Sequence, residues 1–186
     1  MTPPRSIPTV WLRLLTVCAS LFLAAAIDAQ PPPSKPDAQI AAMTKLDYMI
    51  GQWHGDGWMD MGRGRETFRG SENIQRKLGG VALLVEGNFV GRPEGSDHDV
   101  PVHTTLAVIS YDPQAQKYRF QSWLASGMAG ERELVLIADG WQWEIRHPRG
   151  VIRYTMTLRS GEWFEIGERS SDEKTWQKFF EMTLRK

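Results

Sequence analysis

The chain has 186 residues, 41% of them hydrophobic, and its 22 Lys and Arg residues balance its 22 Asp and Glu residues. This length and composition indicate one globular domain with a short appendage. The charge balance argues against nucleic acid as a partner, because a protein that grips phosphates usually carries a basic surplus.

The appendage at the N-terminus, residues 1–29, is predicted to be a secretory signal peptide. Arg5 precedes an apolar run that is interrupted only by Arg13, and small residues follow, with Ala26 and Ala29 as plausible cleavage positions. The apolar run after Arg13 is shorter than the roughly 20 residues that a transmembrane helix needs. We therefore expect a periplasmic or secreted mature chain with no membrane span; an uncleaved anchor is the alternative.

The chain's one cysteine, Cys18, lies inside this predicted peptide. Its context, LTVCAS, is similar to a lipoprotein acylation box, but the branched Val17 stands where such boxes carry a small residue. Cleavage of residues 1–29 would leave a mature chain without cysteine. That chain would have no disulfide even in an oxidising compartment, and its stability would come from its core alone.

Residues 30–42 are interpreted as a proline-rich tether and the start of a short helix, and residues 43–186 as the main domain. The segment QPPPSKP suits neither a helix nor a sheet. Beyond it, apolar residues recur at every third position, at Ile40, Met43, Leu46 and Met49. This spacing predicts one short amphipathic helix.

After Gly51 the pattern changes to an alternation of apolar and polar residues, which is typical of strands with one buried face. It is clearest at 141–147 and 152–158. Turn residues punctuate the pattern at 112–116, 138–140, 147–150, 159–161 and 170–174. We count about ten strands and no convincing helix, and even spacing of short strands predicts a β-sandwich or a β-barrel.

The stretch GQWHGDGWMDM, residues 51–61, is predicted to be the first strand. Alternation places Trp53, Gly55 and Gly57 on one face and His54 on the other. Two glycines on one face let a strand bend sharply or let another backbone approach, as at a barrel corner. We expect Trp53 to plug the barrel end that the short helix covers, and His54 to face solvent.

The pattern Gly51-x-Trp53 after a short helix resembles the calycin superfamily of lipocalins and fatty-acid-binding proteins. With the fuller run LDYMIGQWHGDGW and the later phrases GGVALLVEG and LAVISYDPQAQKYRF, the chain looks most like a bacterial lipocalin-like family of unknown function related to the nitrobindin-type haem barrels. The resemblance covers about residues 46–184. It implies a single antiparallel β-barrel of about ten strands with a short N-terminal helix.

The resemblance also bears on cofactors. Nitrobindin-like barrels hold haem iron through a histidine in a C-terminal strand, and the last predicted strand here, TWQKFFEMTLRK, contains no histidine. We therefore expect no cofactor. If haem binds, His147 is the residue that would ligate its iron.

The candidate ligand-binding residues lie on the predicted inner faces of the strands. His147 shares a face with aromatic residues, although it could simply begin the HPRG turn and face water. Lys178 lies between Trp176 and Phe180, where it could anchor a ligand carboxylate or extend its ammonium group to the rim. The set is Trp53, Trp141, Trp143, His147, Tyr154 and Lys178.

No metal site and no catalytic residue are assigned. Asp97, His98, Asp99 and His103 lie close together, but their spacing matches no metal motif and the segment is interpreted as a solvated loop. Neither a nucleophile motif, a zinc-protease helix nor a phosphate loop occurs.

The hypothesis is thus an exported barrel that binds a hydrophobic or amphipathic small molecule in its lumen. Three alternatives stay open. They are a haem-binding nitrobindin-like protein, a lumen enzyme, which a buried ionisable pair inside the barrel would indicate, and a structural envelope module with a filled barrel.

Overall fold

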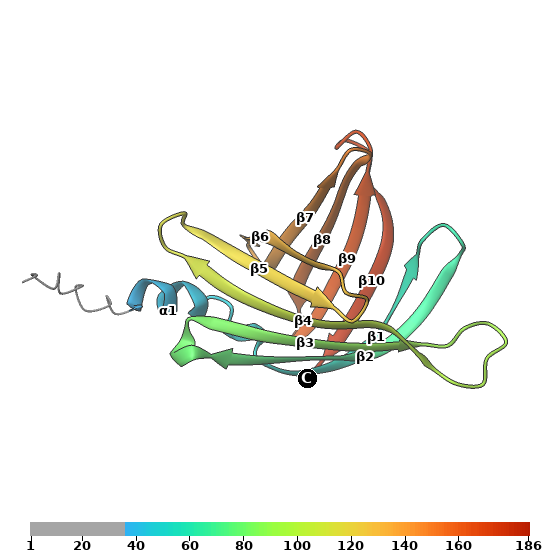
Figure 1. Ribbon diagram of the computed structural model, residues 1–186, viewed down its shortest axis with the longest axis horizontal. Helices are drawn as coiled ribbons and strands as arrows, with labels where there is room; N and C mark the ends of the chain where they lie inside the picture. Colours follow the sequence, from blue (N-terminus) through green and yellow to red (C-terminus); the bar gives the residue numbers. More distant parts are fainter. Residues whose placement is uncertain (1–35) are drawn as a thin grey trace, which may run out of the picture. The chain divides into compact units, whose positions relative to one another are not determined.

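The computed structural model describes residues 36–186, and ten antiparallel strands form a closed barrel in it (Figure 1). The predicted signal peptide and the tether up to residue 35 lie outside the described residues. The strands are β1 (Gly51–Asp60), β2 (Arg65–Lys77), β3 (Ala82–Gly91), β4 (Val100–Asp112), β5 (Lys117–Leu124), β6 (Ala129–Ile137), β7 (Gly140–His147), β8 (Gly150–Arg159), β9 (Glu162–Ser170) and β10 (Gln177–Arg185).

The topology is a simple meander in which each strand pairs with the next one along the chain. β1 then pairs with β10, from His54 opposite Arg185 to Met59 opposite Phe180, and this pairing closes the ring. The five turns expected from the sequence all lie between consecutive strands. The predicted ten-stranded calycin-like barrel is therefore confirmed, and the sandwich alternative is wrong because the sheet has no open edge.

One short helix, α1 (Asp37–Thr44), and a 3₁₀ turn (Asp47–Met49) cover one end of the barrel (Figure 1). The single helix predicted up to Met49 is thus divided into two elements, and three residues of its predicted apolar face, Met43, Leu46 and Met49, are fully buried. The Tyr118 hydroxyl donates a hydrogen bond of 2.8 Å to the carbonyl of Ala42 and fastens the helix to β5. Within residues 36–186 no helix is long and apolar enough to cross a membrane.

Trp53 plugs the barrel at the helix-covered end, as expected. It is 1% exposed, and its indole N–H donates a hydrogen bond of 2.7 Å to the carbonyl of Met49. A Cβ atom on Gly55 would overlap the carbonyl oxygen of Thr183, so its missing side chain lets β1 and β10 approach closely. His54 is exposed on the outer face, as predicted.

The prediction that Lys178 faces the lumen is wrong, because strand β10 is irregular next to it. The register of β10 against β9 shifts between Lys178 and Phe180, which marks a β-bulge at Phe179. A bulge places an extra residue in one strand and so changes which face the preceding residues occupy. Phe179 and Phe180 are both buried, whereas Lys178 is exposed on the outside, where its ammonium group lies 2.5 Å from a Glu181 carboxylate oxygen.

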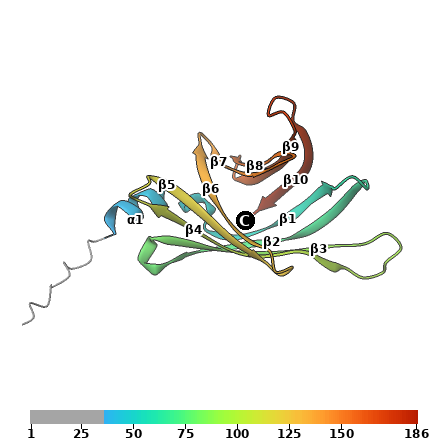
Figure 2. The same cartoon turned by 45° about the horizontal axis from the view of Figure 1, so that its top comes forward.

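The two ends of the barrel differ. Figure 2 shows α1 at one end and the β1–β2 and β3–β4 connections extending at the other, with β7–β10 standing across from β1–β3. Among residues 36–186, no helix lies over the end away from α1. Because inner side chains at that end can be reached from solvent, the lumen is the place to look for a site.

Candidate functional site

The floor of the lumen consists of three tryptophans. Trp53 meets the Trp163 ring edge to face at 5.7 Å, and Trp163 meets Trp141 in the same way at 5.8 Å. All three are at most 5% exposed. Edge-to-face packing of large rings fills space densely, so this layer separates the helix-covered end from the rest of the lumen.

An aromatic wall continues from this floor toward the open end. Trp143 stacks on Tyr154 with ring centroids 4.6 Å apart, and Phe120 packs against Trp143 at 5.4 Å. Tyr154 also meets the edges of Phe179 and Phe180 at 5.8 and 5.7 Å. Beyond Phe180 the wall extends over β2 and β3 through Phe68 and Phe89.

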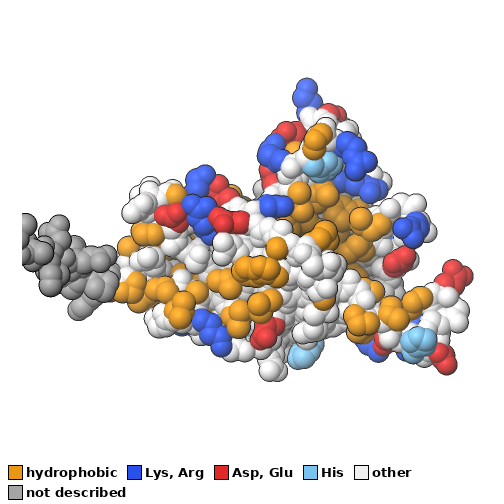
Figure 3. All heavy atoms as spheres, in the orientation of Figure 1, with side chains coloured by type: hydrophobic (Ala, Val, Ile, Leu, Met, Phe, Trp, Pro, Cys, Tyr) orange, Lys and Arg blue, Asp and Glu red, His pale blue; other side chains and the backbone are white. Residues whose placement is uncertain are grey.

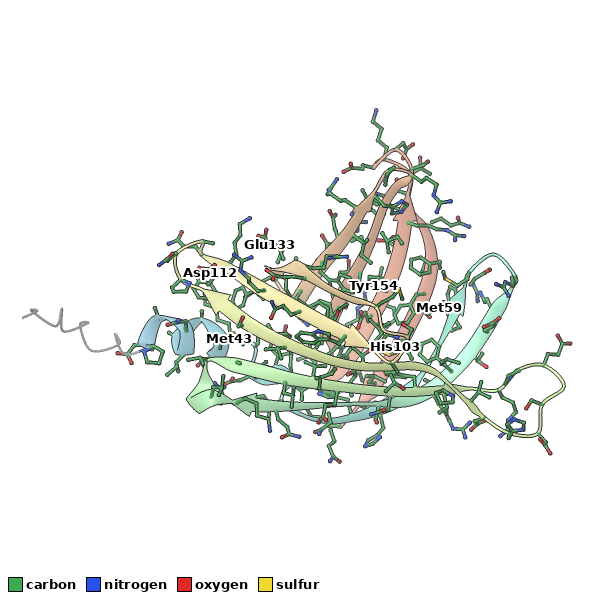
Figure 4. The ribbon with its side chains drawn as sticks, viewed as in Figure 1. Met43, Met59, His103, Asp112, Glu133 and Tyr154 are labelled. Carbon is green, nitrogen blue, oxygen red and sulfur yellow. The ribbon has the colours of Figure 1, made fainter. Side chains whose placement is uncertain are left out.

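Part of this wall is accessible although it faces inward. Trp143, Tyr154, Phe120, Phe68 and Met59 pack against the core, yet each is only half-buried. Figure 3 shows apolar side chains gathered between β10 and the β1–β2 hairpin, and Figure 4 shows Tyr154 and Met59 around the same end. Solvent can therefore reach part of the inner face of the barrel at this end.

Two carboxyl groups lie between the tryptophan floor and the aromatic wall. Glu165 on β9 is 8% exposed, and its Oε2 accepts a hydrogen bond of 2.9 Å from the indole N–H of Trp163. Glu72 on β2 is opposite Trp53 in the register of β1, so it faces the lumen. Its Oε2 is buried with no hydrogen-bond partner, and its Oε1 lies 2.8 Å from where a Cβ on Gly87 would be.

Burial dominates the electrostatics of this layer. It raises the pKa of Glu165 to about 7, although the hydrogen bond from Trp163 opposes the shift. Burial and then the charge of Glu165 raise the pKa of Glu72 to about 8. Burial and the same charge raise the pKa of the Tyr154 hydroxyl to about 12. The Glu72 residue as a whole is half-buried, although its Oε2 atom is buried.

His103 is the histidine that the structure places on the inner face. It lies on β4 opposite Phe89, with ring centroids 6.2 Å apart, and its Nε2 forms a hydrogen bond with the Thr105 hydroxyl. Burial lowers the pKa of His103 below its ordinary value of 6.5, so it is neutral at pH 7. Figure 4 shows it on β4, in the same part of the barrel as Tyr154 and Met59.

The predicted site residues therefore divide into three groups. Trp53 and Trp141 belong to the floor, and Trp143 and Tyr154 belong to the wall. His147 is exposed at the end of β7, where its Nδ1 accepts a hydrogen bond of 3.2 Å from the backbone N–H of Arg149. His147 therefore belongs to the turn and not to the lumen. Lys178 lies on the outer face, so these two residues form the third group, which is outside the lumen.

The position of His147 bears on the haem expectation. An axial ligand has to point at iron held within the lumen, whereas His147 sits in the last pair of the β7–β8 hairpin and bonds to its own turn. His147 thus does not suit the role that the resemblance would give it.

Sequence reasoning missed Glu72, Glu165, His103 and Phe179. A signal existed for His103, because it alternates with Ala107, Ile109 and Tyr111 on one face of β4. In the sequence, Gly95 and Pro101 favour a solvated loop instead. No comparable signal existed for the bulged Phe179.

The charged side chains of the acidic loop before β4 pair with separate partners. Asp99 is held by the guanidinium groups of Arg69 and Arg92, His98 Nδ1 lies 2.9 Å from Asp97, and His103 turns inward. Over residues 36–186, no three His, Cys, Asp or Glu side chains gather as metal ligands would.

Two hollows also lie outside the lumen. One of about 430 Å³ is beside the helix-covered end, lined by Lys45, Tyr48, residues 136–140 and Leu158. The other, of about 360 Å³, is on the outer surface around Leu106 and Trp123 of β4 and β5. Neither contains the carboxyl pair, so the lumen remains the site with the distinctive chemistry.

Comparisons with known proteins agree on the fold. The structure is similar to that of Rv2717c from M. tuberculosis, with a TM-score of 0.54 and 12% identity, over 78% of this chain and 96% of that one. It is also similar to the S-type phycobiliprotein lyase CPES from Guillardia theta, with a TM-score of 0.51 and 8% identity, over 82% of this chain and 96% of the lyase. The sequence matches no protein-family model and no curated protein. At such low identity the similarity shows a shared calycin-like barrel alone.

Proposed function

We propose that this chain is an exported protein that binds a hydrophobic or amphipathic small molecule in the lumen of its barrel. The observation that carries the proposal is the accessible inner wall, in which Trp143 and Tyr154 face inward but are only half-buried. Ligand pockets are usually concave and mainly apolar, with a few polar groups that fix orientation. Here the aromatic wall is the apolar lining, and Glu72, Glu165 and His103 are the polar groups.

Burial of apolar surface would provide most of the affinity. A ligand with a ten-carbon chain gains up to about 8 kcal/mol if each methylene contributes about 0.8 kcal/mol. Lost translational and rotational freedom offsets several kcal/mol of this gain. The remaining gain, up to about 4 kcal/mol, corresponds to dissociation constants in the millimolar range for simple amphiphiles that contact the wall alone.

A neutral fluorescent probe tests the proposal. N-phenyl-1-naphthylamine fluoresces strongly in apolar surroundings, so titration into the purified protein should give a saturable increase. Trp143→Ala should weaken binding, whereas Trp123→Ala, which changes a tryptophan that is 45% exposed on the outer face, should leave it unchanged. Equal effects of both substitutions, or no saturable signal in the wild type, would contradict lumen binding and favour the filled barrel.

A lumen enzyme is the second candidate, and the carboxyl pair is the observation that favours it. Carboxyls whose pKa values lie near neutrality can donate and accept protons at physiological pH. Mass spectrometry of small molecules that copurify with the wild type and with Glu165→Gln separates the two candidates. The same compound in both samples indicates binding; a substrate in the variant and its product in the wild type indicate catalysis.

A further inference from the structure

We propose that the lumen ligand is an organic cation, an apolar body that carries a protonated amine, with the ammonium group held between Glu72 and Glu165. This inference rests on the proposed ligand-binding function and names the chemical class of its ligand. Three features of the carboxyl layer support a cationic ligand: the layer has no counter-charge, one of its oxygens has no partner, and it lies below the aromatic wall.

The first feature is the missing counter-charge. Among the ion pairs formed by residues 36–186, none includes Glu72 or Glu165. The basic residues whose strand positions face inward bond elsewhere. They are Arg76 with Asp47, Arg132 with the Glu131 carbonyl and Arg169 with Gln177. Lys178, which might have supplied the charge, is turned outward by the bulge in β10.

The second feature is the unpartnered oxygen of Glu72. A buried carboxyl group without a hydrogen-bond donor is costly, and a second carboxyl nearby increases the cost. Glu165 has one donor, the Trp163 indole N–H, while Glu72 Oε2 has none within the described part of the chain. A primary ammonium group has three N–H donors. It can supply the donor that Glu72 lacks and the positive charge that both carboxyl groups lack.

The third feature is the position of the pair below an aromatic wall. Glu165 is opposite Met156 of β8, and Tyr154 lies two residues further along the same face toward the open end. A ligand whose head reaches the carboxyl groups would therefore lay its apolar body along Tyr154 and Trp143.

The same arrangement selects against anionic amphiphiles. A fatty acid entering head first would bring its carboxylate against Glu72 and against the more readily ionised Glu165, with no cation to separate the charges. Like charges in a poorly hydrated site repel strongly. A fatty acid entering tail first would leave the two carboxyl groups unpartnered. The chemistry of the layer therefore favours a cationic head over an anionic one.

Three probes with the same ten-carbon chain test the inference by isothermal titration calorimetry at pH 7.5. They are n-decylamine, decan-1-ol and decanoate, used below their aggregation concentrations. We expect n-decylamine to bind at least about tenfold more tightly than decan-1-ol, a difference of about 1.4 kcal/mol, and decanoate to bind most weakly. Glu72→Gln and Glu165→Gln should each remove the advantage of the amine and leave the affinity for decan-1-ol unchanged.

The control is Glu162→Gln, which removes a carboxylate from the outer face of β9, where it pairs with Arg185. This variant should keep the wild-type preference for the amine. Equal binding of amine and alcohol, or an amine preference that survives both lumen substitutions, would overturn the cation assignment while leaving ligand binding intact. If neither these probes nor N-phenyl-1-naphthylamine binds the wild type, the proposed function itself fails.

Discussion

Replacing Glu165 by Gln should make the ligand-free protein more stable at alkaline pH. In the folded protein burial raises the pKa of Glu165 from 4.5 to about 7, whereas in the unfolded chain the group titrates near 4.5. As pH rises through this window, the unfolded state releases its proton first and is favoured. The protonated Glu165 carboxyl therefore contributes its full stability to the folded protein below about pH 4.5, and this contribution is lost as the pH rises through about 7.

The magnitude follows from the size of the pKa shift. A shift from 4.5 to about 7 corresponds to about 3 kcal/mol, since each pKa unit is worth about 1.36 kcal/mol. Gln has no charge to bury, and its side-chain oxygen can still accept the hydrogen bond from Trp163. Glu165→Gln should therefore match the wild type near pH 4.5 and exceed its free energy of unfolding by about 3 kcal/mol at pH 8.

Urea denaturation at both pH values, followed by far-ultraviolet circular dichroism, measures this difference. Glu162→Gln serves as the control, because this carboxylate lies on the surface and pairs with Arg185. Its pH dependence should be that of the wild type. Parallel curves of stability against pH for the wild type and Glu165→Gln would refute the assignment of Glu165 as a buried carboxyl with a raised pKa.

Four further predictions concern barrel closure, the bulge, the rim histidine and the N-terminus. Gly55→Ala should destabilise the protein by about 2 kcal/mol or more in urea denaturation, because its Cβ would overlap the Thr183 carbonyl. Lys178→Ala should leave the affinity for n-decylamine unchanged in calorimetry, because Lys178 is outside the barrel. Any haem absorbance that appears on titration should survive His147→Ala, because His147 bonds to its own turn. Intact mass of protein from the cell envelope should show cleavage near Ala26 or Ala29; an unshortened chain would favour the uncleaved anchor.

The fold was largely predictable from the sequence because its signals are local. Alternation and turn residues determine where each strand begins and ends, and the apolar spacing of Met43, Leu46 and Met49 identifies the helical cap. Trp53 and Gly55 could be assigned to the inner face because they alternate with residues of a mostly polar face. Each of these inferences needs only residues that are adjacent along one strand or helix.

The carboxyl layer was not predictable in the same way, because it depends on which face of a strand is inside. In β9 both faces carry large apolar residues, with Trp163 on the inner face and Phe164 and Ile166 on the outer. Arg159 covers the outer Phe164, with its guanidinium carbon 4.2 Å from the ring centroid. With both faces apolar, alternation alone does not determine whether Glu165 points inward.

The bulge in β10 has a similar explanation. A bulge changes the side-chain pattern by one residue and leaves little trace in composition. The sequence KFF is compatible with either of its phenylalanines facing inward, and the structure buries both. Only the pairing of Lys178 with Glu168 and of Phe180 with Gly167 reveals the shift. This displacement is what moves the positive charge of Lys178 from the lumen to the outer surface.

The stability of the barrel and the chemistry of its lumen therefore come from different layers. The helix-covered end has a dense core of Met43, Leu46 and the tryptophan floor, all apolar and fully enclosed. The layer above it buries two carboxyl groups that weaken the folded state as pH rises. Buried ionisable groups that destabilise a folded protein and have no partner within it tend to occur at functional sites. A cationic ligand would provide that compensation from outside the chain, since its charge would lower both pKa values and its N–H groups would satisfy Glu72.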